Sequence, residues 1–203
     1  MELSLREGEF LVRIAREAIA YFFEHKDIMP LPDEYPEILN QKRGVFVTLN
    51  TYPDKNLRGC IGYPLPLEPV IKGTISSAIS AAFGDPRFQP LVMPELDKVV
   101  VEVTVLSPMK LLSKDKPYAE QIKVGRDGLY VVCGANSGLL LPQVPVEWGW
   151  DEEAFLANVC HKAGLDYTCY EDDACSFYSF TGQIFEEEEP NGRVVEKKIE
   201  EVL

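Results

Sequence analysis

The six residues from Leu57 to Gly62 bring several chemically useful groups into one short stretch. Arg58 and Cys60 are two residues apart, and side chains alternate between the faces of a strand, so in a strand both would project from one face. A neighbouring cation favours the thiolate, which is the reactive form of cysteine. Gly59 and Gly62 would let a ligand or another backbone approach closely. This hexapeptide is therefore either a reactive site or a glycine-kinked strand around a small buried cysteine.

Two charged residues further along the chain are candidates for the same site. Arg87 follows a predicted helix, and its guanidinium matches the geometry of carboxylate and phosphate groups, so we expect it to bind an anionic group of a substrate. Glu102 lies in the middle of a predicted strand, and paired with Arg58 or Arg87 it would be an acid or base group. The structural alternatives are an ordered turn in which Asp85 holds Arg87, and a carboxylate of Glu102 that is solvated or paired with an arginine.

A loop after a later strand offers one more polar candidate. Gln143 and Glu147 would line a cleft there, while Trp148 and Trp150 are expected to pack against other residues. The segment 125–128, Gly-Arg-Asp-Gly, lacks the spacing of nucleotide-binding loops and is expected to form a tight turn between strands.

The cysteines and histidines of this chain do not form a metal-binding pattern. There are five cysteines without a Cys-x-x-Cys pair, and two histidines, so we expect no structural metal. The N-terminus does not resemble a secretory signal, which favours reduced thiols and a cytoplasmic protein. A disulfide among Cys160, Cys169 and Cys175 stays open if the source is a hyperthermophile. His161, beside Cys160 on a predicted helix, is expected at the surface or satisfied in the core.

Composition limits the classes of partner. The 203 residues carry a net charge of −13, which argues against non-specific binding to a phosphate backbone. The length suits one large domain or two small ones. No apolar run is long enough to predict a transmembrane helix.

Hydrophobic periodicity predicts a mixture of helices and strands. A run of acidic residues at 186–189 is expected to be a solvated surface turn. Helices are expected at 5–24, 68–83 and 151–163, and strands at 44–50, 57–62, 99–106, 122–124, 128–133, 139–141 and 177–185. A loop at 134–138 would close a hairpin. Because the elements do not alternate as βαβ units, the predicted class is α+β.

The order of these motifs resembles the AMMECR family. The shared blocks are Leu57–Gly62, Ala81–Leu91, Glu102–Ser107, Gly125–Leu129, Leu140–Val144 with Glu147 and Trp150, and Cys160–Gly164. The resemblance covers residues 7–185 and implies one AMMECR-type domain over residues 1–203. It implies a larger and a smaller lobe, each with a mainly antiparallel sheet flanked by helices, and a cleft between them.

The resemblance implies a pathway rather than an established reaction. In some microbes a domain of this family is fused to, or encoded beside, a Memo-type domain and a radical S-adenosylmethionine protein. We therefore expect an enzyme of a modification pathway, without a cofactor of its own. The alternative is a non-catalytic module that binds a protein partner of Memo type, and RNA binding is less favoured because of the charge.

In the enzyme interpretation each candidate residue has a role. Cys60 would be the nucleophile or a thiol ligand, Arg58 its electrostatic partner, and Glu102 the general base. Arg87 would anchor an anion. The substrate-binding side would also include Gly59, Gly62 and Gln143.

Overall fold

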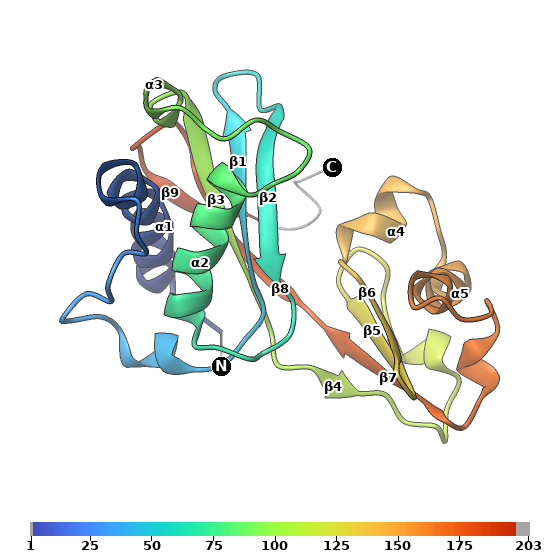
Figure 1. Ribbon diagram of the computed structural model, residues 1–203. Coiled ribbons are helices and arrows are strands. Elements are labelled where there is room, and N and C mark those ends of the chain that lie inside the picture. The colour runs from blue at the N-terminus through green and yellow to red at the C-terminus, as the bar shows by residue number, and fades with distance from the viewer. Residues whose placement is uncertain (1, 198–203) are drawn as a thin grey trace. The chain divides into compact units, whose positions relative to one another are not determined.

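The computed structural model describes residues 2–197 and shows an α+β protein with two antiparallel sheets, as the sequence predicts (Figure 1). The described chain divides into two compact units, each with its own hydrophobic core. The first unit contains residues 2–106 and 183–197, and the second contains residues 107–182. That these units form the two lobes of one domain stays a prediction.

A five-stranded sheet forms the centre of the first unit. Its strands, in spatial order, are β2 (Leu57–Tyr63), β1 (Val45–Thr51), β3 (Val99–Leu106), β8 (Gly182–Glu187) and β9 (Val194–Lys197). β1 pairs antiparallel with both β2 and β3, and β8 pairs antiparallel with β9. β2 is therefore an edge strand, and the hexapeptide lies on it.

Helices cover one face of this sheet. α1 (Leu5–His25) begins at a capping box formed by Ser4 and Glu7, as expected, and α2 (Val70–Phe83) follows the β1–β2 hairpin. A short helix, α3 (Met93–Leu96), precedes β3, and η1 (Glu37–Asn40) is a 3₁₀ turn. The core beneath α1 and α2 consists of alternate strand residues, among them Val45, Val47, Leu49, Val101, Val103 and Val105. Because strand side chains alternate, Thr48 and Glu102 face away from this core.

The end of the sheet departs from the sequence prediction. The alternating run at 177–185 is not one strand: β7 (Cys175–Phe180) belongs to the second unit and β8 to the first. The prediction of a solvated acidic run is wrong for Glu186 and Glu187, which are 1% and 3% exposed in β8. Both carboxylates have partners, as buried charges require.

Long-range ion pairs explain why two glutamates can be buried here. Arg16 of α1 donates its Nε–H to Glu187 at 2.8 Å and also donates to the carbonyls of Leu96 and Val99. Glu186 binds the ammonium groups of Lys55 and Lys197. These partners lie far from β8 in the sequence, apart from Lys197.

The second unit contains a four-stranded sheet in the order β4 (Lys110–Leu111), β7, β5 (Gly128–Cys133) and β6 (Asn136–Leu140). Its helices are α4 (Gln143–Glu147) and α5 (Glu152–Lys162), with 3₁₀ turns η2 (Tyr118–Gln121) and η3 (Cys169–Glu171). Asp151 caps α5 by accepting a hydrogen bond from the Ala154 amide at 2.8 Å, as its place before the apolar run predicts.

Three local predictions in the second unit are wrong. Residues 122–124 form no strand, because Ile122 packs into the core directly after η2. The hairpin loop is shorter than expected, since β6 already begins at Asn136. Trp148 is 70% exposed and stacks on Trp150, so its indole lies largely in solvent.

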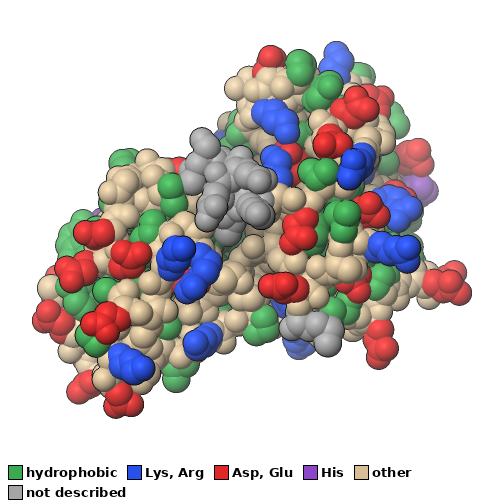
Figure 2. Space-filling model, turned by 180° about the vertical axis from the view of Figure 1, so that it is seen from behind, with side chains coloured by type: hydrophobic (Ala, Val, Ile, Leu, Met, Phe, Trp, Pro, Cys, Tyr) green, Lys and Arg blue, Asp and Glu red, His purple; other side chains and the backbone are tan. Residues whose placement is uncertain are grey.

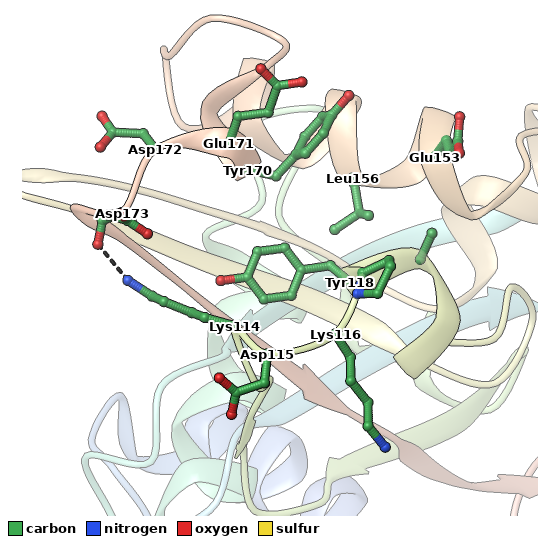
Figure 3. A pocket seen from close by; sticks show the side chains of 12 residues that line it. Lys114, Asp115, Lys116, Tyr118, Glu153, Leu156, Tyr170, Glu171, Asp172 and Asp173 are labelled. Atoms are coloured by element: carbon green, nitrogen blue, oxygen red, sulfur yellow. Dashed lines mark hydrogen bonds between the residues drawn. The ribbon is translucent and has the colours of Figure 1, made fainter.

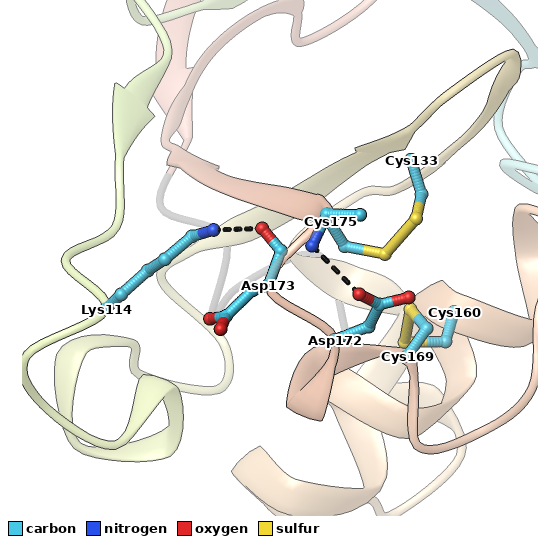
Figure 4. Close-up of a disulfide and its surroundings, with 8 residues drawn as sticks. Lys114, Cys133, Cys160, Cys169, Asp172, Asp173 and Cys175 are labelled. Carbon is cyan, nitrogen blue, oxygen red and sulfur yellow. Dashed lines mark hydrogen bonds between the residues drawn. A yellow bond between two sulfur atoms is a disulfide. The ribbon is translucent and has the colours of Figure 1, made fainter.

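Four of the five cysteines are joined in disulfides, all in the second unit (Figure 4). Cys133 pairs with Cys175, its cross-strand neighbour on β7, and Cys160 of α5 pairs with Cys169 of η3. The expectation of reduced thiols is therefore wrong, except for Cys60. None of the helices among residues 2–197 is long and apolar enough to cross a membrane.

Candidate functional site

The hexapeptide lies on β2 with Gly59 turned toward α2. A Cβ atom on Gly59 would lie 2.2 Å from the carbonyl oxygen of Ala81, and one on Gly62 would lie 2.3 Å from the Phe46 ring. Both positions therefore need glycine for close packing. Cys60 lies between them, half-buried, with its thiol on the face that carries Thr48.

A clamp formed by Asp85 and Arg87 holds the backbone of Cys60 at the sheet edge. Asp85 accepts the Cys60 amide at 2.9 Å, and Arg87 Nη2 donates to the Cys60 carbonyl at 3.2 Å. Asp85 in turn accepts the Arg87 amide and its Nε–H, each at 3.0 Å. These two side chains satisfy strand-edge groups that would otherwise be open to pairing with another strand.

The clamp is electrostatically strong. Asp85 is 5% exposed, yet hydrogen bonds from Arg87, and then from the Cys60 and Arg87 amides, hold the pKa of its carboxyl far below the usual range despite burial. The ordered turn in which Asp85 holds Arg87 is thus present. The Arg87 side chain remains 53% exposed.

Arg58 occupies a different position from the one expected for a partner of the thiol. A bulge opposite Leu49 and Asn50 interrupts the regular alternation at Arg58. Its guanidinium forms a bidentate pair with Glu95 of α3, with both contacts at 2.9 Å, and donates to the Gln89 carbonyl. The cation that acts on the thiol of Cys60 is Arg87 instead.

The environment of Cys60 keeps its thiol protonated. Burial raises its pKa, and a hydrogen bond from the Thr48 hydroxyl, with Oγ1 at 3.4 Å from Sγ, together with the charge of Arg87, offsets this only in part. The sequence-based expectation of a lowered pKa is therefore wrong. The physical reason is that desolvation of the thiolate outweighs the nearby cation.

A row of polar side chains crosses the sheet beside the thiol. Thr48 of β1 is opposite Cys60 of β2 on one side and opposite Glu102 of β3 on the other. Glu102 is 9% exposed, and its pKa is raised by burial and by the charge of Glu186, against a hydrogen bond from Thr48. Thr48 is thus the side chain between a thiol and a buried carboxyl.

Glu102 does not pair with either candidate arginine, contrary to the sequence-based interpretation. Arg58 is bound to Glu95 and Arg87 to Asp85. The charges that act on Glu102 come from Glu186, Lys197 and Lys55, and the sequence predicted none of these three as a neighbour of Glu102. Among residues 2–197, Glu186 Oε1 has no hydrogen-bond partner.

The remaining candidates lie outside this row. Gln143 belongs to the second unit, where it is the first residue of α4, and its role in substrate binding stays a prediction. Within the described chain, one group of ligand-type atoms lies close enough for a metal: Cys133, Asp172 and Cys175, within 4.8 Å of one another. Both of those sulfur atoms are joined in a disulfide, which removes the thiolates that a metal would need.

Thr48 is the residue that sequence reasoning missed. The only indication in the sequence was its place in the predicted strand before the hexapeptide, on the same face of that strand as Phe46. The register that puts it opposite Cys60 depends on the connection between β1 and β2. That register was not readable from the sequence.

Comparisons with known proteins agree with the motif pattern. The AMMECR1 family model matches residues 12–185. "Protein MJ0810" of Methanocaldococcus jannaschii is 51% identical over 199 residues, which cover 97% of this chain and 98% of that protein. "Protein MK0488" of Methanopyrus kandleri is 53% identical over 206 residues, covering 98% of each chain.

A solved structure supports the same assignment. The crystal structure of uncharacterized protein PH0010 from Pyrococcus horikoshii superimposes with a TM-score of 0.81 at 50% sequence identity, covering 95% of this chain and 97% of that one. The family model and these relatives span nearly the whole sequence. This chain therefore belongs to the AMMECR1 family.

Proposed function

We propose that this protein is a thiol enzyme of a modification pathway, in which the sulfur of Cys60 bonds to an electrophilic carbon of a small anionic substrate while the bond from that carbon to a leaving group breaks and the leaving group departs with the bonding electron pair. The observation that carries the proposal is the position of Thr48 between the free thiol of Cys60 and the buried carboxyl of Glu102. Thr48 and Glu102 would remove the thiol proton, and Arg87 would bind the anionic group.

The proton transfer follows from the two pKa shifts. A thiol with a raised pKa stays protonated near neutral pH and needs a base before it can act as a nucleophile. Glu102, whose pKa is also raised, is a stronger base than an ordinary carboxylate once ionised. In the structure the Thr48 hydroxyl donates its single hydrogen to Sγ. For the relay this hydrogen turns to Glu102, and the hydroxyl oxygen accepts the thiol proton on a lone pair, because a hydroxyl has one donor and two acceptor positions.

Arg87 is the group best placed to bind a substrate anion. Asp85 engages its Nε and Nη2 groups. Its Nη1 group donates no hydrogen bond to any of residues 2–197, and the side chain is about half exposed. An anion bound at Nη1 would lie beside the strand that carries Cys60, and charge-assisted hydrogen bonds to guanidinium are strong.

The family resemblance suggests that the protein works with a Memo-type or radical S-adenosylmethionine partner. A cytoplasmic setting is a separate expectation, which came from the sequence. Disulfides are rare in cytoplasmic proteins, but intracellular proteins of hyperthermophiles are an exception, and Pyrococcus, a thermophile genus, is among the relatives.

The alternative function is a module that binds a protein partner. Exposed apolar side chains near the Arg58–Glu95 pair favour it: Leu57, Val92 and Met93 are 41%, 56% and 54% exposed. In that case the Asp85–Arg87 clamp would serve only to brace the sheet edge. Binding to RNA has less support, because the net charge is −13 and the face in Figure 2 intersperses basic with acidic side chains.

Alkylation of the native protein tests the proposal. Cys60 is the free cysteine, so peptide mass spectrometry locates its reaction with neutral iodoacetamide and with anionic iodoacetate. We expect labelling by both at pH 7, and the ratio of iodoacetate to iodoacetamide rates should fall severalfold in Arg87→Gln.

The matched control is Arg126→Gln in the second unit. Arg126 is a similarly exposed arginine that also pairs with one buried aspartate, Asp127. It should leave the ratio unchanged. A native thiol that reacts with neither reagent would be structural, and the binding-module alternative would then stand.

A further inference from the structure

The second unit contains a cavity of about 640 Å³ that has no part in the chemistry of Cys60 (Figure 3). Three segments line it: the loop before η2, the start of α5, and the segment from η3 to β7. Its size is in the range of small-molecule sites. All of its lining residues belong to this one unit.

The floor of the cavity is apolar and aromatic. Leu156 of α5 is 3% exposed, and Figure 3 shows it between the rings of Tyr118 and Tyr170 in that view. The ring of Tyr118 packs at a tilt of 35° against the ring of Phe177, with centroids 4.9 Å apart. Surfaces of this kind bind methylene groups, because burial removes apolar area from water. They also bind cations, because the faces of aromatic rings attract positive charge.

The rim of the cavity is negatively charged. Five carboxylates line it against two lysines. Among residues 2–197, the carboxylates of Glu153, Glu171 and Asp173 form no ion pair and accept no hydrogen bond. Lys114 donates its ammonium hydrogen to the backbone carbonyl of Asp173. The rim therefore has unused negative charge.

Disulfides hold the acidic wall in place. Glu171, Asp172 and Asp173 are consecutive residues between Cys169 and Cys175, each of which is joined to another element (Figure 4). Like charges this close repel one another. The covalent links at both ends restrain the backbone that carries these three side chains.

We propose that this cavity binds a polyamine, an aliphatic chain that carries several ammonium groups. The methylenes would lie on Leu156 and the tyrosine rings, and the ammonium groups would meet Glu153 on one side and Glu171 and Asp173 on the other. Burial and the charge of Asp173 raise the pKa of Tyr118, so its hydroxyl stays neutral and can accept a hydrogen bond from an ammonium group.

Isothermal titration of the intact, oxidised protein with spermidine tests this site. We expect one saturable site per chain. The double variant Glu171→Gln, Asp173→Asn should weaken binding about fivefold to tenfold, which is the size expected for two exposed charges. Asp166→Asn, which removes an exposed carboxylate of the same unit outside the cavity, should change the affinity less than twofold.

A variant that binds spermidine more tightly provides a second test, because a loss of folding cannot produce a gain of affinity. Lys116 is exposed on the rim, and its ammonium group pairs with no other described residue, so Lys116→Gln should tighten spermidine binding. The proposal is overturned if spermidine shows no saturable binding, if Asp166→Asn weakens it as much as the double variant, or if Mg²⁺ at equal charge displaces it. Tighter binding of a lysine-rich peptide than of spermidine would assign the cavity to a polypeptide instead.

Discussion

At the scale of single residues, the clamp formed by Asp85 and Arg87 decides how Cys60 is presented. The thiol is fixed through its own backbone, since the amide and the carbonyl of Cys60 both bind side chains of the turn after α2. Arg87 thereby brings its charge to the thiol, while Arg58, the nearer arginine in sequence, is engaged by Glu95. One aspartate thus positions both the cation and the nucleophile.

Substitution of Asp85 should reveal this role through its pH dependence. The pKa of Asp85 in the fold lies below its unfolded value of about 3.9. Its stabilising contribution is therefore full above that unfolded pKa and is lost as pH falls through the folded pKa. Asp85→Asn should lower the free energy of unfolding by about 2–3 kcal/mol at pH 7, the cost of losing charged hydrogen bonds to buried groups.

Urea unfolding at pH 7 and at pH 3 measures the effect. The deficit of Asp85→Asn should shrink at the lower pH. An equal deficit at both values would show that the ionised carboxylate is not what stabilises the turn.

Some of these side-chain interactions were predictable from the sequence. The Asp85–Arg87 pair was one of two interpretations of the turn, because the residues are close in sequence. The Arg58–Glu95 pair and the position of Thr48 were not predictable, because they depend on a bulge in β2 and on the register of the hairpin. The desolvation of the Cys60 thiol was not predictable from the sequence either, because the burial of a side chain is a property of the folded chain.

At the scale of elements, the glycines of the hexapeptide control how closely β2 and α2 pack. Gly59 faces the backbone of Ala81 at the end of α2, and a side chain there would meet a carbonyl oxygen that has no freedom to move. Ala78 and Ala82 of α2 are buried in the core of this unit. The hexapeptide therefore has a structural requirement in addition to any chemistry.

Gly59→Ala should lower the free energy of unfolding by about 3 kcal/mol, because overpacking against fixed backbone is costly. Gly73 of α2 is a matched control, since a Cβ there would meet Val45 at an ordinary 3.5 Å. Gly73→Ala should stabilise the protein by about 0.5–1 kcal/mol, the helix preference of alanine. Chemical unfolding of both variants gives the comparison, and a neutral Gly59→Ala would mean that β2 and α2 can separate without cost.

Elements with strong local signals were predicted well. α1, α2 and α5 have apolar periodicity and capping residues, and β3 has a clear alternation. The split between β7 and β8 was missed because the alternation continues through the point where the chain passes from one sheet to the other. The burial of Glu186 and Glu187 was missed because Lys55 and Arg16, which bind them, are distant in sequence.

At the scale of the whole molecule, the two units differ in what stabilises them. The first has an extensive aliphatic core under α1 and α2 together with the buried Arg16–Glu187 pair. The second has a smaller core and contains both disulfides. Cross-links that close loops of 9 and 42 residues each contribute about 2–4 kcal/mol in the chain-entropy description.

Reduction should therefore destabilise the second unit selectively. Hydrogen exchange followed by mass spectrometry, with and without a phosphine reductant, measures it strand by strand. Amides of β5 and β7 should lose protection, while those of β1 and β3 should keep it. Equal loss in both sheets would show that the units do not respond independently.

The central claim is a relay that carries the thiol proton from Cys60 through Thr48 to Glu102. In one test, this relay and a purely electrostatic effect of Glu102 predict opposite changes in the alkylation rate of Cys60. An ionised Glu102 raises the pKa of Cys60 by its charge. If Glu102 acts only through that charge, Glu102→Gln should make the thiol more acidic and its alkylation faster. If Glu102 accepts the thiol proton through Thr48, the variant should react more slowly.

The measurement is the rate of iodoacetamide labelling of Cys60 at pH 7 in the native protein, in Glu102→Gln and in the control Thr104→Val, a β3 threonine opposite Phe46 rather than Thr48. Glu102→Gln should keep the fold, because the neutral glutamine side chain matches the uncharged form of Glu102 that burial favours. The relay predicts at least a severalfold slower reaction in Glu102→Gln and an unchanged rate in Thr104→Val. A faster or equal rate in Glu102→Gln would contradict it.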